Sequence, residues 1–227
     1  MDTFQFACHK GLSCYTKCCR DVNIWLTPYD VMRMKNALGI SSEDFLLKYT
    51  LPRKSKKGLP LVLLKMQDNA ERTCPFVTSE GCIIYPDRPW SCRVYPVEEM
   101  TDDGKFRLTK FDFCLGFNEK KQWTIEEWKE DQGLKPYLAM EKAYKAVIES
   151  KSWDKIPVMK GEAWQMFYMA CYNIDRFRQF LKVGQTLKRL RLPEERIRRI
   201  KEDDEELLRF AFEWVRFAIL GEPIFII

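Results

Sequence analysis

The sequence has 227 residues, of which 46% are hydrophobic and 14% are aromatic. A chain of this length and composition can bury a full core as one large domain or as a domain with an appended subdomain. Lys and Arg number 38 against 33 Asp and Glu, and the resulting net charge of +5 is too small to indicate a polyanionic partner.

The amino terminus, MDTFQFAC, lacks the basic and apolar segments of a secretory signal. No stretch reaches about 18 consecutive apolar residues, and the apolar end at residues 223–227 is too short to span a bilayer. We therefore expect a cytoplasmic protein without a membrane span. In a reducing compartment, nine cysteines favour metal ligation or redox chemistry over disulfides, which remain the alternative.

The cysteines divide the chain into two regions, because eight lie between Cys8 and Cys114 and the last half contains only Cys171. We expect a mostly α fold. Residues 1–120 should form an irregular cysteine-cluster metal-binding region with short helices and room for a small sheet. Residues 121–227 should form a helical bundle that packs on the first region as one compact unit.

Helix signals occur early in the first region. Thr27 as N-cap, Pro28 at the first helical position and Asp30 near the positive end of the helix dipole predict a helix that ends at Gly39. A second capping pair at residues 41–44 predicts a short following helix. These two helices should brace the cysteine loops.

Strand signals in the first region are weaker. The apolar run at residues 61–66 and the alternating segment at residues 106–113 are consistent with strands. Residues 102–104 indicate a turn, and residues 53–58 indicate an exposed basic loop.

The second region begins with a capping box formed by Thr124 and Glu127. Apolar residues at spacings of three and four then predict the core stripe of one long helix: Trp164, Phe167, Cys171, Ile174, Phe177 and Leu181. A final helix from about Pro193 carries a second apolar face: Leu207, Ala211, Trp214 and Ala218. Because Cys171 lies on the core stripe, it is excluded from the metal set.

The remaining cysteines form two sequence groups of four. The first contains Cys8, Cys14, Cys18 and Cys19; the second contains Cys74, Cys82, Cys92 and Cys114. Four thiolates suit either a tetrahedral zinc or a cubane iron-sulfur cluster. The chain has no Cys-x2-Cys pair, which structural zinc sites favour, so the wide spacings favour iron-sulfur clusters of the 4Fe-4S type, with zinc as the alternative.

The adjacent cysteines Cys18 and Cys19 limit how ligands can be shared. Neighbouring side chains in an extended segment point to opposite faces, so without a turn at this point the two sulfurs should serve different metals. One cluster can therefore draw ligands from both sequence groups, and the sequence does not assign cysteines to individual clusters.

Residues near the cysteines suggest further roles. Arg88 and Arg93 flank Cys92, and guanidinium groups near an anionic cluster would stabilise it and raise its reduction potential. The alternative for both arginines is solvation at the surface. His9, beside Cys8, is a candidate extra ligand or proton donor, and its alternative is an exposed loop position.

Four segments carry a resemblance to a known family: CYTKCCR at residues 14–20, LTPYDV at 26–31, CPF at 74–76 and CIIYPDRPWSCRVYP at 82–96. They resemble the YkgJ-like cysteine-cluster family, described as zinc- or iron-chelating proteins. That family opens with Cys-x2-Cys-x2-Cys-Cys, whereas this chain has gaps of five and three residues, and the departure weakens the case for Cys8. The resemblance covers about the first 115 residues and implies metal binding without specifying a reaction.

These observations leave several functions open. The first is electron transfer, redox partnering or service as a metallocentre accessory, with the bundle docking a protein partner. The alternatives are a structural zinc-binding interaction protein and a group-transfer enzyme resembling the flagellin lysine methylases, for which no catalytic residue is nominated. Nucleic-acid binding is disfavoured, because the basic stretch at residues 188–201 is followed by acidic residues 202–206 that can pair with it.

Overall fold

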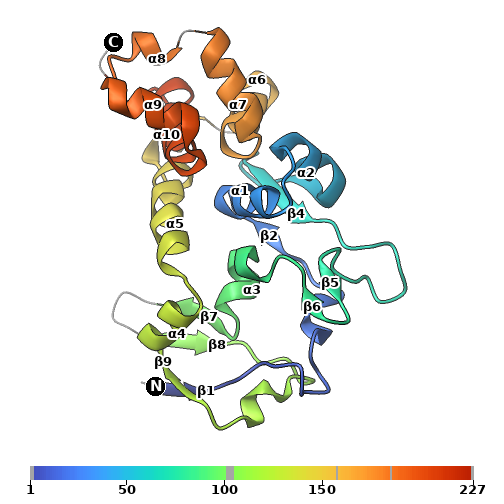
Figure 1. The fold of residues 1–227 in the computed structure, drawn as a ribbon. Helices are drawn as coiled ribbons and strands as arrows, with labels where there is room; N and C mark the ends of the chain where they lie inside the picture. The colour runs from blue at the N-terminus through green and yellow to red at the C-terminus, as the bar shows by residue number, and fades with distance from the viewer. Residues whose placement is uncertain (1–2, 101–104, 157, 185, 226–227) are drawn as a thin grey trace.

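In this computed structural model, which describes residues 3–100, 105–156, 158–184 and 186–225, helices account for about half of the chain. The strands are short and form small separate sheets, so the predicted mostly α class is confirmed. Figure 1 shows the amino-terminal strand β1 (Thr3–Gln5) at one end of the molecule and the carboxy-terminal helices at the other.

The cysteine-rich region consists of short helices and strands that irregular loops connect. After β1 these are η1 (Lys17–Cys19), β2 (Trp25–Leu26), α1 (Pro28–Ala37), α2 (Ser42–Tyr49), β3 (Thr50–Lys54), β4 (Pro60–Leu64), β5 (Val77–Thr78), β6 (Gly81–Cys82), η2 (Tyr85–Asp87), α3 (Trp90–Val94), β7 (Val97–Met100), β8 (Phe106–Leu108), η3 (Leu115–Asn118) and β9 (Gln122–Thr124), where η denotes a 3-10 helix.

The two predicted helices of this region form as expected. Thr27 and Asp30 make a capping box at the start of α1, and Gly39, with a φ of +63°, follows the end of the helix. At the start of α2, the Ser41 hydroxyl accepts a hydrogen bond from the Asp44 amide at 3.0 Å. Local capping signals therefore fix both helices.

The predicted strands are shorter than the sequence patterns. The first forms β4, which lies between β2 and β3 in an antiparallel sheet, and residues 55–59 connect β3 to β4. The second ends at Leu108 because Phe111 and Phe113 leave the strand and line a cavity described below. The predicted turn at residues 102–104 and the chain ends at residues 1–2 and 226–227 lie outside the described residues.

The second region is helical and begins with the predicted capping box of Thr124 and Glu127. Its elements are α4 (Ile125–Asp131), α5 (Lys135–Ile148), η4 (Lys151–Lys155), α6 (Gly161–Cys171), α7 (Ile174–Val183), α8 (Thr186–Arg189), α9 (Glu194–Glu202) and α10 (Asp204–Ala218).

Two predicted long helices are each divided in the structure. The stripe that begins at Trp164 continues through α6 and α7, but Asn173 separates them and its side chain caps α7. Likewise, Asp203 separates α9 from α10 and accepts a hydrogen bond from the Glu206 amide at 2.7 Å. The expectation of single helices was wrong because these capping side chains satisfy a new helix start. Ala218, expected on the core face, is exposed.

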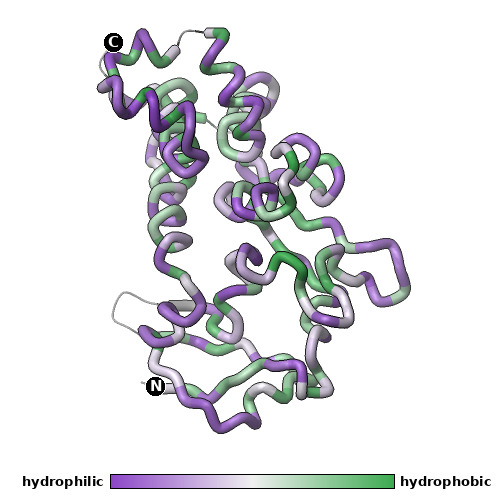
Figure 2. Tube along the Cα trace, in the orientation of Figure 1, coloured by the Kyte–Doolittle hydropathy of each residue, from purple (hydrophilic) through white to green (hydrophobic). Residues whose placement is uncertain are grey.

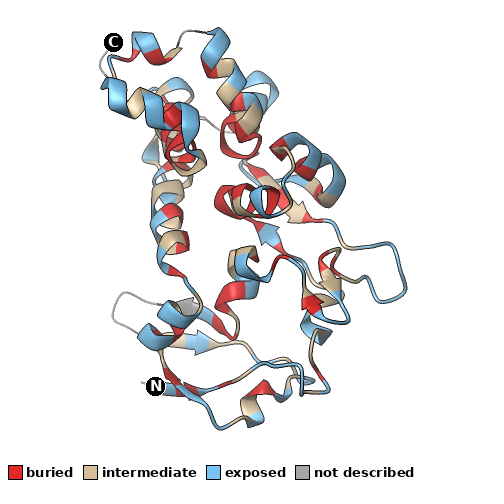
Figure 3. Ribbon diagram, viewed as in Figure 1, coloured by how far each residue is buried: buried red, intermediate tan, exposed pale blue. Residues whose placement is uncertain are grey.

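Two hydrophobic cores hold the chain together. The larger core joins the helices of the second region to α1, α2 and β4, and Figure 3 shows buried residues where these helices face one another. The smaller core gathers Phe4, Phe6, Trp123 and Trp128 around the pair formed by β1 and β9. Both cores combine residues from the first 120 positions with residues that follow them.

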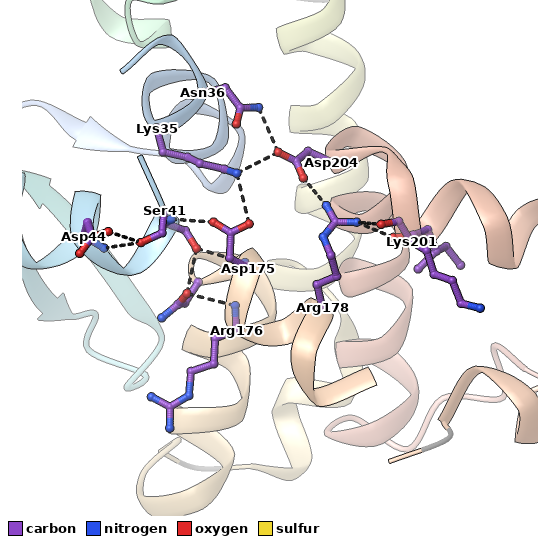
Figure 4. A network of polar contacts seen from close by, with 12 residues as sticks. Lys35, Asn36, Ser41, Asp44, Asp175, Arg176, Arg178, Lys201 and Asp204 are labelled. Atoms are coloured by element: carbon purple, nitrogen blue, oxygen red, sulfur yellow. Dashed lines mark hydrogen bonds and ion pairs between the residues drawn. The ribbon is translucent and has the colours of Figure 1, made fainter. Parts of the chain in front are cut away.

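A network of ion pairs attaches the helical region to α1 (Figure 4). The ammonium of Lys35, whose side chain is only 8% exposed, lies 3.3 Å from the Asp175 carboxylate and 3.0 Å from the Asp204 carboxylate. Arg178 also pairs with Asp204. Lys35 belongs to α1, whereas its partners belong to α7 and α10, so the network links the two regions.

The basic stretch near the carboxy terminus forms ion pairs with acidic residues. In α9, which Figure 2 shows as mainly hydrophilic, Arg196 lies 3.0 Å from Glu206 and 2.8 Å from Glu213. Arg198 pairs with Glu195 within the same helix. Among the described residues, no helix combines the length and apolar character needed to cross a membrane.

Replacing Lys35 by Met should lower the free energy of unfolding by about 2–3 kcal/mol, because two partly buried carboxylates lose their shared cation. Urea denaturation at neutral pH measures this change. The control Lys142→Met, at an exposed position of α5, should change stability by no more than about 0.5 kcal/mol. Equal losses in the two variants would contradict a linking role for Lys35.

Candidate metal centre

A cavity of about 660 Å³ lies between the two hydrophobic cores. Its wall includes Ile24 and Phe76 from the larger core and Phe6 and Trp128 from the smaller one. All eight cysteines predicted as ligands line it: Cys8, Cys14, Cys18, Cys19, Cys74, Cys82, Cys92 and Cys114. A single water needs only about 10–15 Å³ of such space, so the cavity far exceeds the size of one small ion.

Backbone contacts hold the first cysteine group against distant segments. The Cys74 amide donates to the Cys19 carbonyl at 2.8 Å. On another side, the Leu115 amide donates to the Cys14 sulfur at 3.3 Å. Cys18 and Cys19 lie in the 3-10 turn η1 and not in an extended segment, so the expectation that their side chains point to opposite faces was wrong. The Cys19 thiol is the main cause that raises the pKa of Cys18, so the two thiols lie beside each other.

A tight hairpin presents Cys74 and Cys82. The amide of Val77 donates to the Cys74 carbonyl at 3.2 Å, and Val77 pairs with Cys82 across β5 and β6. Gly81 has a φ of +113°, and a Cβ there would lie 2.4 Å from the Tyr15 hydroxyl. The hairpin therefore requires glycine at this position.

Cys92 lies in α3, and a carboxylate from α1 fixes that helix. One oxygen of Asp30 accepts from the amide and the hydroxyl of Thr27, each at 2.8 Å, and the other accepts from the Trp90 amide at 2.7 Å. Trp90 is the first residue of α3, whose N-cap, Pro89, supplies no side-chain cap. The fully buried Asp30 therefore caps two helices. Burial raises the pKa of Asp30 to about 6, and the donors from Thr27 and Trp90 oppose this shift.

Electrostatic contacts divide most of the thiols into two neighbourhoods. The thiols that raise the pKa of Cys8 are Cys18, Cys14 and Cys114. The thiols that raise the pKa of Cys92 are Cys74, Cys18 and Cys82. Cys18 therefore lies between the two neighbourhoods. Cys19 packs against the larger core, as Cys82 does.

Burial favours the protonated form of several of these thiols in the metal-free chain. Burial, followed by the charges of neighbouring thiols, raises the pKa of Cys8 to about 11. Burial, opposed by the Phe76 amide, raises the pKa of Cys74 to about 11. Cys92 presents open surface to the cavity although protein surrounds it, and burial raises its pKa as well. A cation that binds these thiols must therefore displace their protons.

The two arginines that flank Cys92 are buried, so the alternative of simple surface solvation was wrong. Arg88 and Arg93 are 7% and 6% exposed. Arg93 donates to the Gln132 carbonyl at 2.5 Å and lies over the Tyr137 ring. Both arginines therefore help to attach the segment around Cys92 to the loop after α4.

The candidate His9 and the excluded cysteine Cys171 both lie away from the cavity. His9 is exposed, its Nδ1 accepts from the Gly11 amide at 3.2 Å, and its Nε2 lies 3.6 Å from the Glu119 carboxylate. Cys171 is fully buried in the larger core, as the helical stripe predicted. Neither residue lines the cavity within the described part of the chain.

Sequence reasoning missed several residues that shape the site. Asp30 was predicted to lie near the start of α1 only, and no sequence pattern indicated its hydrogen bond to the Trp90 amide. The buried hydroxyl of Tyr95 makes no hydrogen bond of normal geometry within the described residues, although the Cys114 thiol lies close to it. Burial, followed by the Cys114 thiol, raises the pKa of Tyr95. Cys114 is separated from Tyr95 by 18 intervening residues in the sequence, including the undescribed segment 101–104. No local signal could therefore have revealed the contact between these two residues.

The donor set fits a sulfur-bound metal centre. Eight thiols, an amide aimed at the Cys14 sulfur and an apolar wall meet in one cavity. Within the described chain, no three cysteine, histidine, aspartate or glutamate side chains converge enough to hold a single metal ion. The thiols instead surround a shared space. The site is that of a thiol-rich metal-binding protein.

Comparison with known families agrees with this class. The model of the CxxCxxCC family, "Putative zinc- or iron-chelating domain", matches residues 7–126, which is more than half of the chain. The protein belongs to this family, as the sequence resemblance indicated. The match includes all eight cysteines that line the cavity. No curated protein and no solved structure matches the chain.

Replacing Asp30 by Asn should lower the free energy of unfolding by about 1–3 kcal/mol, because an amide can accept at only one of its two terminal atoms and leaves a buried amide donor unpaired. The control Asp44→Asn alters an exposed carboxylate at the start of a single helix and should cost less than about 1 kcal/mol. Chemical denaturation of the metal-free protein compares the two. If Asp30→Asn costs no more than the control, Asp30 does not link α1 to α3.

Proposed function

We propose that the protein binds two iron-sulfur clusters of the 4Fe-4S type and exchanges electrons with a protein partner. The observation that carries this proposal is the convergence of eight thiols on one cavity of about 660 Å³. A cubane cluster takes four terminal thiolates, so the eight thiols match two clusters. Bound clusters would supply one-electron redox chemistry.

The spread of the thiols supports clusters over zinc. Four thiolates around one zinc ion all lie about 2.3 Å from it and therefore crowd together. In a cubane each terminal sulfur binds a different iron, so the four sulfurs can stand further apart. The thiols of this chain surround a large space, which is the arrangement that the larger group needs.

The neighbourhoods of the thiols suggest how they divide between two clusters. We assign to the first cluster the set around Cys8: Cys8, Cys14, Cys18 and Cys114. Cys18 also lies near Cys19, Cys74 and Cys92, and it joins the first set because the second set already has four other thiols. We assign to the second the set around the hairpin and α3: Cys19, Cys74, Cys82 and Cys92. Cys19 joins the second set because its carbonyl bonds the Cys74 amide and its side chain packs on the larger core.

This division supports electron transfer because it places the two clusters next to each other. Cys18 and Cys19 are adjacent in η1, so each cluster would be bound from the same turn. In the first set Cys8 and Cys18 are exposed and Cys14 is buried; in the second set Cys92 is exposed and Cys74 is buried. Cys74 belongs to the larger core and Cys19 and Cys82 pack against it, whereas Cys114 packs against the smaller core. The first cluster would therefore face a docking partner and the second would lie against the larger core. A cytoplasmic location would keep unbound thiols reduced.

Protein purified without oxygen should contain about eight iron and eight sulfide per chain, because two cubanes occupy the eight thiols. Elemental analysis and a sulfide assay provide the measurement. Zinc at stoichiometric level without sulfide would contradict the proposal and would make the site a structural zinc centre.

Serine substitutions test the division into two clusters. Cys114→Ser and Cys74→Ser should each remove about half of the iron, because each removes a ligand of a different cluster. Cys171→Ser is the matched control and should leave the iron content unchanged, although it places a hydroxyl in the core. Loss of all iron in either single variant would contradict separate clusters.

A further inference from the structure

We infer that Arg88 is the countercharge for the cluster assigned to Cys19, Cys74, Cys82 and Cys92. The fold buries the positively charged side chain of Arg88 at the wall of the cavity that would hold this cluster. This inference rests on the proposed function. Arg88 lines the cavity and is only 7% exposed.

The position of Arg88 relative to the thiols supports this role. Arg88 lines the same cavity as Cys82 and Cys92, and it donates to the carbonyl of Tyr85, three residues after Cys82. The Cys92 thiol in turn is among the groups that act on the Arg88 guanidinium. The side chain therefore lies near two of the four proposed ligands of the second cluster.

The hydrogen-bond partners of Arg88 are neutral. One guanidinium nitrogen donates to the Tyr85 carbonyl at 2.6 Å and another to the Gln132 side-chain oxygen at 2.5 Å. The guanidinium carbon also lies 3.9 Å from the centre of the Tyr85 ring. These contacts fix the orientation of the side chain, and none of them supplies a negatively charged partner.

Within the described chain, no carboxylate lies at ion-pair distance from Arg88, and the charged side chain that acts on it is the cation of Arg93. Arg178 shows the contrast, because this partly buried arginine pairs directly with Asp204. An unpaired buried charge is costly, and the cost is offset when an opposite charge enters the same environment. Burial accordingly lowers the pKa of Arg88.

An iron-sulfur cluster with four thiolates carries a net negative charge. Binding at the second thiol set would place that charge beside Arg88, whose orientation Tyr85 and Gln132 already hold. The metal-free protein thus bears the cost of the buried cation, and the loaded protein gains the attraction. Arg88 acts through the cluster ligands and their environment, so it is a positioning residue that tunes retention and reduction potential.

Three variants of the full chain test this inference: Arg88→Met, Arg88→Lys and the control Arg178→Met. Cluster loss to an iron chelator should be about 10–100-fold faster in Arg88→Met than in the wild type, and the reduction potential should become more negative. Arg88→Lys keeps the charge and should restore most of both properties. The metal-free Arg88→Met protein loses the contacts with Tyr85 and Gln132 together with the cost of a buried cation, so its unfolding temperature should fall by less than that of metal-free Arg178→Met.

Arg178→Met should lower the unfolding temperature of the metal-free and loaded forms alike and leave the reduction potential unchanged. The role of Arg88 as a countercharge is refuted if Arg88→Met keeps the cluster-loss rate and reduction potential of the wild type, or if Arg88→Lys loses its cluster as fast as Arg88→Met does. It is also refuted if the unfolding temperature of metal-free Arg88→Met falls as far as that of metal-free Arg178→Met. A wild-type chain that takes up no iron and sulfide would instead refute the proposed function itself, so the two failures are distinguishable.

Discussion

The carboxylate of Asp30 is the contact on which the geometry of the site depends most. It closes the capping box of α1 and, through its second oxygen, caps α3, the helix that carries Cys92. Burying a carboxylate is costly, but three donors and the nearby Arg93 offset that cost. Since α1 is also attached to the carboxy-terminal helices through Lys35, Asp30 connects the helical scaffold to the cavity wall.

The cavity itself follows from the meeting of two cores. The larger core supports the hairpin of Cys74 and Cys82, and the smaller core supports the segments around Cys8 and Cys114. Cysteines line the space between the cores, with Cys74 in the larger core and Cys114 and Tyr95 packed against the smaller one. Protonated thiols and buried guanidinium groups together form a space whose charge balance suits an anionic cluster.

The sequence predicted those features that depend on neighbouring residues. The capping signals at Thr27, Ser41 and Thr124 each begin a helix in the structure, because a cap needs only the next three residues. The breaks at Asn173 and Asp203 could have been found in the same way, since both are good N-cap residues, but the apolar stripe alone suggested continuous helices.

The cavity could not be predicted in the same way. The contact of Asp30 with Trp90 and that of Cys14 with Leu115 join residues 60 and 101 positions apart, and no local pattern encodes them. The burial of Arg88 could not be predicted from the sequence either. Its hydrogen-bond partners are a backbone carbonyl and a glutamine side chain, and no acidic residue at a regular spacing indicates an ion pair.

X-ray absorption at the iron and zinc edges of protein purified without oxygen tests the central claim most directly. We expect iron bound by sulfur alone, with a second shell of neighbouring iron atoms, because each cluster contains several metals. Zinc surrounded by four sulfurs at about 2.3 Å, with no metal neighbour, would contradict it.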